Sequence, residues 1–237
     1  MSAKLLLKIF LPILSALFVS GCNSSDNGGG PADANKGRRV NPDAEYPLTF
    51  FQIIEEETDI FRTNMKGRAA DVNGNGTTLT AVVVFKNRKR QMYESIDVIR
   101  QIVTVSLGFH GTVKTSSYTR YIGTTGHLIA QYYPATDVTC QPVMPDKFPD
   151  IVKLGDSGVL STLMCSDGTS YRSEWTVTDG GSGNIALTVS AQQISTSETT
   201  LNTGDEVYII NLEGKVVGFE MHIEDFVNQQ TITLKAR

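Results

Sequence analysis

The segment Asp71-Val72-Asn73-Gly74-Asn75-Gly76 carries oxygen-bearing side chains at alternate positions and glycine at the sixth. Calcium-binding loops use this spacing, because hard cations take carboxylate and amide oxygens and the glycine permits a sharp turn. Such a loop also requires a bidentate glutamate at its twelfth position, which is Val82 in this chain. Asn-Gly pairs before an apolar segment are typical of hairpin turns, so we predict a turn here and no metal site.

Gly155-Asp156-Ser157-Gly158 resembles the tetrapeptide around the nucleophile of chymotrypsin-like proteases, and His110 and Asp137 precede it in that family's order. In such a triad the histidine takes the serine proton and the aspartate orients the histidine. The likeness ends there, because neither the residues around His110 nor Val159-Leu160 after the tetrapeptide match the family. A triad needs mutual geometry as well as order, so we predict a turn before a strand and no catalytic residue.

Lys86-Asn87-Arg88-Lys89-Arg90 is the densest basic cluster in the sequence. It could bind anionic sugar phosphates or an anionic cell wall. A run of charges is more often a solvated loop, and we expect a loop that joins two strands. His222 lies on the polar side of an alternating segment and is expected to be exposed, whereas His127 has no partner that the sequence reveals.

The N-terminus has the features of a secretory signal peptide. Lys4 and Lys8 precede an apolar run from Ile9 to Val19, and small residues follow it. The run is about half as long as the ~20 residues that cross a bilayer as a helix. We therefore assign residues 1–21 to targeting, as a signal helix outside the folded domain.

Val19-Ser20-Gly21-Cys22 resembles the lipobox of bacterial lipoproteins, which is an aliphatic residue, two small residues and an obligatory cysteine. In that family the cysteine sulfur is joined to diacylglycerol, the chain is cut just before it, and the new amino group receives a fatty acid such as palmitate. The resemblance implies that Cys22 is lipidated and that its acyl chains hold the protein on the cell-envelope membrane. Asn23 implies the outer membrane, because an aspartate there favours inner-membrane retention in the enterobacterial version.

Cys140 and Cys165 remain as an even pair once Cys22 is lipidated. The compartment that the lipobox implies is oxidising, and neither cysteine has a CxxC partner or an adjacent histidine. We predict a structural disulfide between them, which stabilises the fold by roughly 3 kcal/mol in the chain-entropy model.

The composition favours strands. Val, Ile and Thr supply 62 of the 237 residues, whereas Leu and Ala supply 30. Branched side chains fit a pleated surface better than a helix. Thr77–Phe85 is apolar enough for a central strand, and period-two alternation marks further strands at Ser173–Val177, Ile185–Val189 and Val217–Glu224.

Gly and Asp/Asn clusters separate these segments and predict tight turns. They lie at Ser166–Thr169, Asp179–Asn184, Asn202–Asp205 and Leu212–Lys215. Glu94–Val103 fits a helix and a strand equally well, because its apolar spacing is helical but its residues are β-branched.

We predict an all-β fold, in which an antiparallel meander forms a β-sandwich or barrel over residues 48–237. Residues 22–47 are rich in Gly, Pro, Asn, Asp and Ser and are expected to be a lipidated, disordered tether. Four prolines between Pro134 and Pro149 mark a long connection, so a division into two subdomains near 134–155 is the alternative to one domain.

Charge argues against nucleic acid as a partner. Residues 22–120 carry a net charge of +2 and residues 121–237 one of -8, whereas a nucleic-acid binder needs a basic face. The segment Val152–Trp175 resembles only stretches of bacterial lipoproteins of unassigned function. We expect a non-enzymatic envelope lipoprotein with no cofactor, which binds an envelope protein or the cell wall. The alternatives are a carrier of an apolar ligand inside a barrel and a serine hydrolase.

Overall fold

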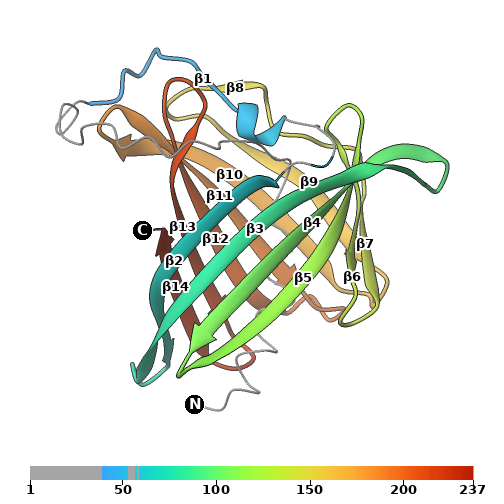
Figure 1. Ribbon diagram of the computed structural model, residues 1–237, viewed down its shortest axis with the longest axis vertical. Helices are drawn as coiled ribbons and strands as arrows, with labels where there is room; N and C mark the ends of the chain where they lie inside the picture. The colour runs from blue at the N-terminus through green and yellow to red at the C-terminus, as the bar shows by residue number, and fades with distance from the viewer. Residues whose placement is uncertain (1–38, 53–56, 58, 237) are drawn as a thin grey trace.

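The protein is a closed, all-β barrel of twelve antiparallel strands (Figure 1), as seen in a computed structural model that describes residues 39–52, 57 and 59–236. The predicted signal peptide, Cys22 and the linker as far as residue 38 lie outside the described residues. Of the two architectures that the sequence allowed, the structure has the barrel.

The barrel strands are mostly successive hairpins. They are β2 (Asp59–Asp71), β3 (Gly76–Tyr93), β4 (Ile96–Phe109), β5 (Thr112–Gly123), β6 (Leu128–Tyr133), β7 (Val138–Pro142), β9 (Ser157–Cys165), β10 (Ser170–Gly181), β11 (Asn184–Ile194), β12 (Thr200–Ile210), β13 (Val216–Asp225) and β14 (Gln230–Ala236). Outside the barrel wall lie β1 (Tyr46–Pro47), the 3-10 helix η1 (Thr49–Phe51) and β8 (Ile151–Val152).

Two pairings close the barrel. β14 pairs with β2, which joins the last strand of the chain to the first strand of the barrel, and β7 pairs with β9 across the proline-rich connection. Strands from both sides of residues 134–155 therefore belong to one wall. β8, which lies in this connection, leaves the wall and pairs with β1.

Alternation along each strand separates an apolar interior from a polar exterior. On β13 Phe219, Met221 and Ile223 are buried, while His222 and Glu224 face outward. Trp175 and its neighbours on β10 follow the same pattern, as predicted. Val217 departs from its expected inward position and is exposed, because the register shifts between Ile209 and Ile210 of the adjacent strand.

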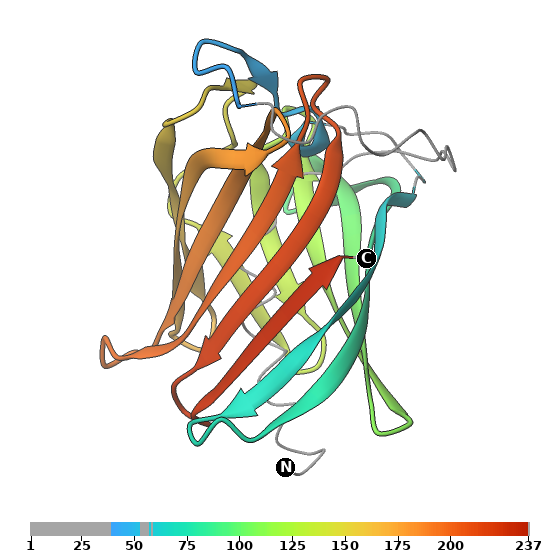
Figure 2. The same ribbon diagram turned by 90° about the vertical axis from the view of Figure 1, so that its left-hand side faces the viewer.

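Aromatic side chains cover one end of the barrel, which we call the capped end (residues 39–52 and 143–156; top of Figures 1 and 2). η1 places Phe50 and Phe51 inside, where both rings contact Tyr208, and Phe51 also contacts Phe148. Residues 39–47, which the composition assigns to the tether, lie at this end, where the apolar side chains of Val40 and Tyr46 are buried.

Two local predictions are settled by the barrel. In the segment 94–103, which fits either a helix or a strand, Glu94 and Ser95 form a turn and residues 96–103 lie in β4. The turn predicted at Asn202–Asp205 is wrong, because these residues lie within β12 and Gly204 pairs with Ala191 and Ile223. The turn lies a few residues earlier, where Ser195 Oγ accepts hydrogen bonds from the backbone N–H groups of Ser197 and Thr199.

Among the residues that the structure describes, no helix has the length and apolar character needed to cross a membrane.

Candidate functional site

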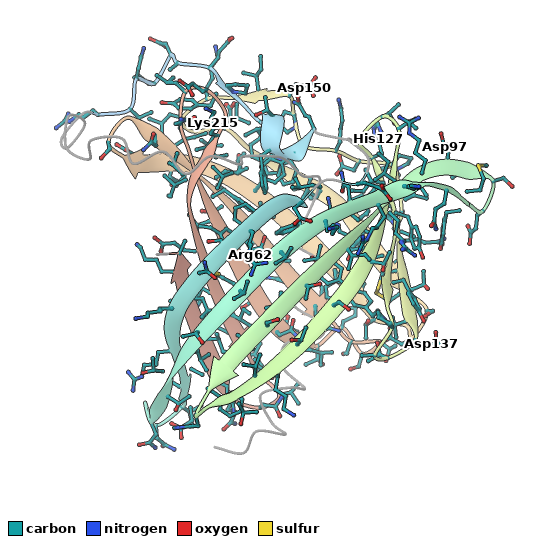
Figure 3. All side chains as sticks on the ribbon, in the orientation of Figure 1. Arg62, Asp97, His127, Asp137, Asp150 and Lys215 are labelled. Atoms are coloured by element: carbon teal, nitrogen blue, oxygen red, sulfur yellow. A yellow bond between two sulfur atoms is a disulfide. The ribbon has the colours of Figure 1, made fainter. Side chains whose placement is uncertain are left out.

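The three residues of the protease-like pattern are not brought together. Ser157 starts β9 near the capped end, where it pairs with Thr176 of β10. His110 and Asp137 occupy the β4–β5 and β6–β7 turns at the opposite end, where Figure 3 labels Asp137 far from Asp150 and Lys215. His110 Nε2 instead forms a hydrogen bond of 2.8 Å with the Thr77 hydroxyl.

The Gly-Asp-Ser-Gly tetrapeptide has a structural explanation. Gly155 adopts a φ of 91°, and Asp156 accepts a hydrogen bond from the Lys153 backbone N–H at 2.8 Å, so together they form the turn before β9. Gly158 lies opposite Trp175, and a Cβ atom there would come within 2.8 Å of the indole ring. The second glycine therefore makes room for a ring on the neighbouring strand.

Asp71 organises the β2–β3 hairpin turn that the sequence predicted. Its Oδ1 accepts hydrogen bonds from the backbone N–H groups of Asn73 and Asn75, each at 2.9 Å, and its Oδ2 accepts one from the Asn75 side chain. These hydrogen bonds, that from the Asn75 side chain first, lower the pKa of Asp71. No group of three His, Cys, Asp or Glu side chains among the described residues is arranged to hold a metal ion.

The two cysteines lie opposite each other on β7 and β9 and form the disulfide Cys140–Cys165. The bridge ties β9, the first barrel strand after the proline-rich connection, to β7, which lies within that connection. It therefore fixes the pairing that closes this wall of the barrel.

The basic cluster is a strand, and its prediction as a loop is wrong. Residues 86–90 lie within β3, which runs on to Tyr93 and projects with β4 beyond the barrel (Figure 1). A register shift between Asn87 and Arg90 lets the chain carry three consecutive exposed basic residues while it stays paired with β4. Asn87 itself points inward and is buried.

Asn87 begins a row of buried polar side chains that sequence reasoning missed. Paired positions on four neighbouring strands place Asn87, Gln101, Arg120 and Gln131 side by side on the interior wall, and the row continues to Cys140. Gln101 donates from Nε2 to Asn87 Oδ1 at 3.1 Å and accepts from Arg120 Nη1 at 3.0 Å. The sequence pattern could have identified them, because each of these polar residues occupies an inward-facing position of an alternating strand.

Arg120 is fully buried, yet the Nε–Nη2 edge of its guanidinium group has no hydrogen-bond partner. The Nε2 group of neighbouring Gln131 is also unpartnered, while its Oε1 accepts from the Tyr133 hydroxyl at 2.7 Å. These donors form a fork of the kind that binds a planar oxyanion. Burial lowers the pKa of Arg120.

Glu206 faces this cluster from β12. Its Oε2 accepts a hydrogen bond from the Tyr208 hydroxyl at 2.6 Å, and its Oε1 has no partner. Burial raises the pKa of Glu206 well above its usual range, against the opposing effects of the Tyr208 hydrogen bond and the positive charge of Arg120. The carboxyl group is therefore driven toward its protonated, neutral form.

The cavities lined by described residues differ in size and character. One that reaches interior residues Leu128, Leu160 and Ser173 holds about 20 Å³, the space of a single water molecule. A hollow of about 380 Å³ at the capped end lies between Arg39 and the β10–β11 and β12–β13 turns. Another, of about 470 Å³, lies over β2 and β3.

No family model matches the chain, and the search of curated proteins gives no match. Among solved structures, a Bacteroides fragilis protein described as exported and as having a YmcC-like fold aligns with 78% of this chain and 97% of its own. The TM-score is 0.34 and the sequence identity 10%. A likeness this low indicates neither a shared function nor a shared fold.

Proposed function

We propose that this protein is a lipoprotein of the bacterial outer membrane, anchored by acyl chains on Cys22, whose barrel has a non-enzymatic binding or structural role. The lipobox Val19-Ser20-Gly21-Cys22 supports the anchor. The observation that carries the role is the position of Ser157, which lies at the other end of the barrel from His110 and Asp137.

The anchor is tested by metabolic labelling with a fatty acid. We expect the wild-type chain to be labelled and to sediment with membranes, and Cys22→Ala to lose both properties. Cys140→Ser/Cys165→Ser is the matched control, because it removes the disulfide-bonded cysteines without touching the lipobox and should remain labelled. A Cys22→Ala chain that is still labelled would contradict the anchor.

The non-enzymatic role is tested with a fluorophosphonate probe, which labels activated serines. We expect no labelling of the wild-type chain and no difference from Ser157→Ala. Labelling that depends on Ser157 would replace the binding role with a hydrolase. Crosslinking in intact cells, read by mass spectrometry, should then recover an envelope protein or cell-wall partner.

The free edge of Arg120 favours a second candidate, a carrier of an apolar molecule with a carboxylate head. The unpartnered Nε–Nη2 edge of Arg120 would pair with the carboxylate, and the apolar core residues of the barrel would contact the rest of the ligand. Extraction of the purified protein followed by mass spectrometry tests this. A bound carboxylate should accompany wild type and the exposed control Arg62→Gln but not Arg120→Gln, and its absence from wild type would exclude the carrier.

A further inference from the structure

The β3–β4 hairpin places basic and apolar side chains together on a projecting surface. Arg88, Lys89 and Arg90 are exposed at its base, and Met92 and Ile96 are exposed at its tip, Met92 by 64%. Met92 pairs with Asp97 and Ile96 with Tyr93, so the two apolar side chains project from opposite faces of the ribbon. The tip therefore presents apolar groups whichever face it turns to a surface.

A second exposed apolar pair follows β7, whose end contacts this tip. Gln141 of β7 donates from Nε2 to Glu94 Oε2 at 3.4 Å, which holds the hairpin turn against the end of that strand. Val143 and Met144, two and three residues further on, are exposed by 64% and 68%. We call Arg88, Lys89, Arg90, Met92, Ile96, Val143 and Met144 the hairpin surface.

The hairpin surface is basic, whereas the C-terminal half of the chain is acidic. The segment 86–97 has four basic and two acidic side chains, a net of +2, whereas residues 121–237 carry -8. Some of this charge is paired, since Lys86 lies 3.0 Å from Asp59 and Arg90 lies 3.6 Å from Asp97. Basic residues beside exposed apolar ones are the combination that binds an anionic lipid surface, through headgroup attraction and shallow burial of the apolar groups.

Arg39, the first residue that the structure describes, lies at the same end of the barrel as the hairpin surface. Arg39 lines the hollow at the capped end, and the β3–β4 hairpin leaves the barrel from that end (Figures 1 and 3). Sixteen residues lie between Cys22 and Arg39, so a fully extended chain holds the lipidated cysteine no more than about 60 Å from Arg39. A membrane that holds Cys22 is thus within reach of the hairpin surface.

We propose that the hairpin surface binds the anionic phospholipids of the membrane that carries the anchor, and so orients the barrel with its capped end toward the bilayer. This inference rests on the proposed lipid anchor. Each basic residue near an anionic surface strengthens binding about fivefold, so the hairpin adds a second attachment to the acyl chains. Because the charge is local, the contact weakens as salt screens it.

The test uses the acylated protein in vesicles of phosphatidylethanolamine and phosphatidylglycerol. Met92→Cys carries a fluorophore, and a brominated lipid in the vesicle quenches it on contact. Val113→Cys is the matched control, an equally exposed aliphatic position beside Lys114 at the opposite end of the barrel. We expect quenching at position 92, little at position 113, and loss of quenching in phosphatidylcholine vesicles or at high salt.

Charge removal completes the test. Arg88→Gln/Lys89→Gln should shift the contact equilibrium about 30-fold toward the free state, while Lys114→Gln leaves it unchanged. Thermal unfolding of each variant shows that the barrel is intact. Equal quenching at positions 92 and 113, or quenching that ignores these charges, would overturn the proposal, and a crosslink from position 92 to a protein would assign the surface to a protein partner.

Failure of the anchor gives a different result from failure of the hairpin. An unlabelled wild-type chain whose position 92 is still quenched by added anionic vesicles would remove the anchor and keep the lipid-binding hairpin. A labelled, membrane-bound chain with no quenching at position 92 would keep the anchor and remove the hairpin contact.

Discussion

Arg120 donates a hydrogen bond of 3.0 Å to Gln101 inside the barrel, from the paired position on the adjacent strand. This contact ties β4 to β5 at a buried level of the wall, and Gln101 extends it to Asn87 on β3. A slip of β4 by one residue would turn Gln101 outward and leave the Arg120 guanidinium group buried without this acceptor, so the contact specifies the register as well as stabilising it.

Gln101→Leu should destabilise the barrel by about 3 kcal/mol, because it removes the acceptor of Arg120 Nη1 and leaves a buried charge without that hydrogen bond. The measurement is the free energy of unfolding in urea. Thr104→Ala on the outer face of the same strand is the control and should change it by no more than about 0.5 kcal/mol. Equal losses of unfolding free energy from both variants would show that the Arg120–Gln101 hydrogen bond stabilises the barrel no more than an outer-face side chain does.

Glu206→Gln should stabilise the protein at neutral pH. Burial raises the pKa of Glu206 in the folded state, so folding takes up a proton between the unfolded and folded pKa values, and stability falls as the pH rises through that window. Glutamine keeps the acceptor for the Tyr208 hydroxyl without that penalty. The melting temperature should therefore exceed that of wild type at about pH 8, and the difference should vanish below about pH 4.

Constancy of the melting-temperature difference between about pH 4 and pH 8 would contradict a raised pKa at Glu206. Glu174→Gln, on the outer face of β10, controls for the loss of one negative charge. Each kcal/mol changes the melting temperature by about 2–4 °C in a domain of this size.

Cys140→Ser/Cys165→Ser should cost about 3 kcal/mol of stability, because the disulfide closes a loop across a sequence separation of 25 residues and restricts the unfolded chain. Denaturant unfolding measures the loss. Reduction of the wild-type protein should reproduce it, and the reduced variant should show no further change. An unchanged midpoint in both experiments would mean that strand pairing alone fixes β7 against β9.

Gly158→Ala should destabilise the protein by about 1–3 kcal/mol, because the new methyl group would meet the Trp175 ring and force it to move. Trp175 is the single tryptophan of the chain, so its fluorescence reports the movement directly. Val159→Ala, at the exposed position beside it, should leave both stability and emission unchanged. Wild-type emission from Gly158→Ala would show that the ring has room.

The alternation of Phe219, Met221 and Ile223 and the turn at Asp71–Gly76 were readable from the sequence, because residue phase and glycine placement are local properties. The projecting strand at residues 86–90 was not, since a run of charges looks the same in a loop as on a ribbon that extends beyond a barrel. The turn predicted at Asn202–Asp205 was wrong because local residue types do not show which strands lie on either side. These turn-forming residues lie inside β12, where Gly204 pairs with β11 on one side and β13 on the other and therefore stays extended.

The sequence by itself determined the all-β class, because the excess of branched residues and period-two phase act within each strand. It also contained a segment that resembles a lipobox, and an even pair of further cysteines that predicted the disulfide. The tertiary structure decided which strands are neighbours. It thereby decided which side chains form the buried row from Asn87 to Gln131, that Ser157 lies far from His110, and which residues lie beside the basic hairpin. Closure of the barrel depends on the pairing of β14 with β2 and of β7 with β9, which joins residues far apart in the chain and which no local pattern encodes.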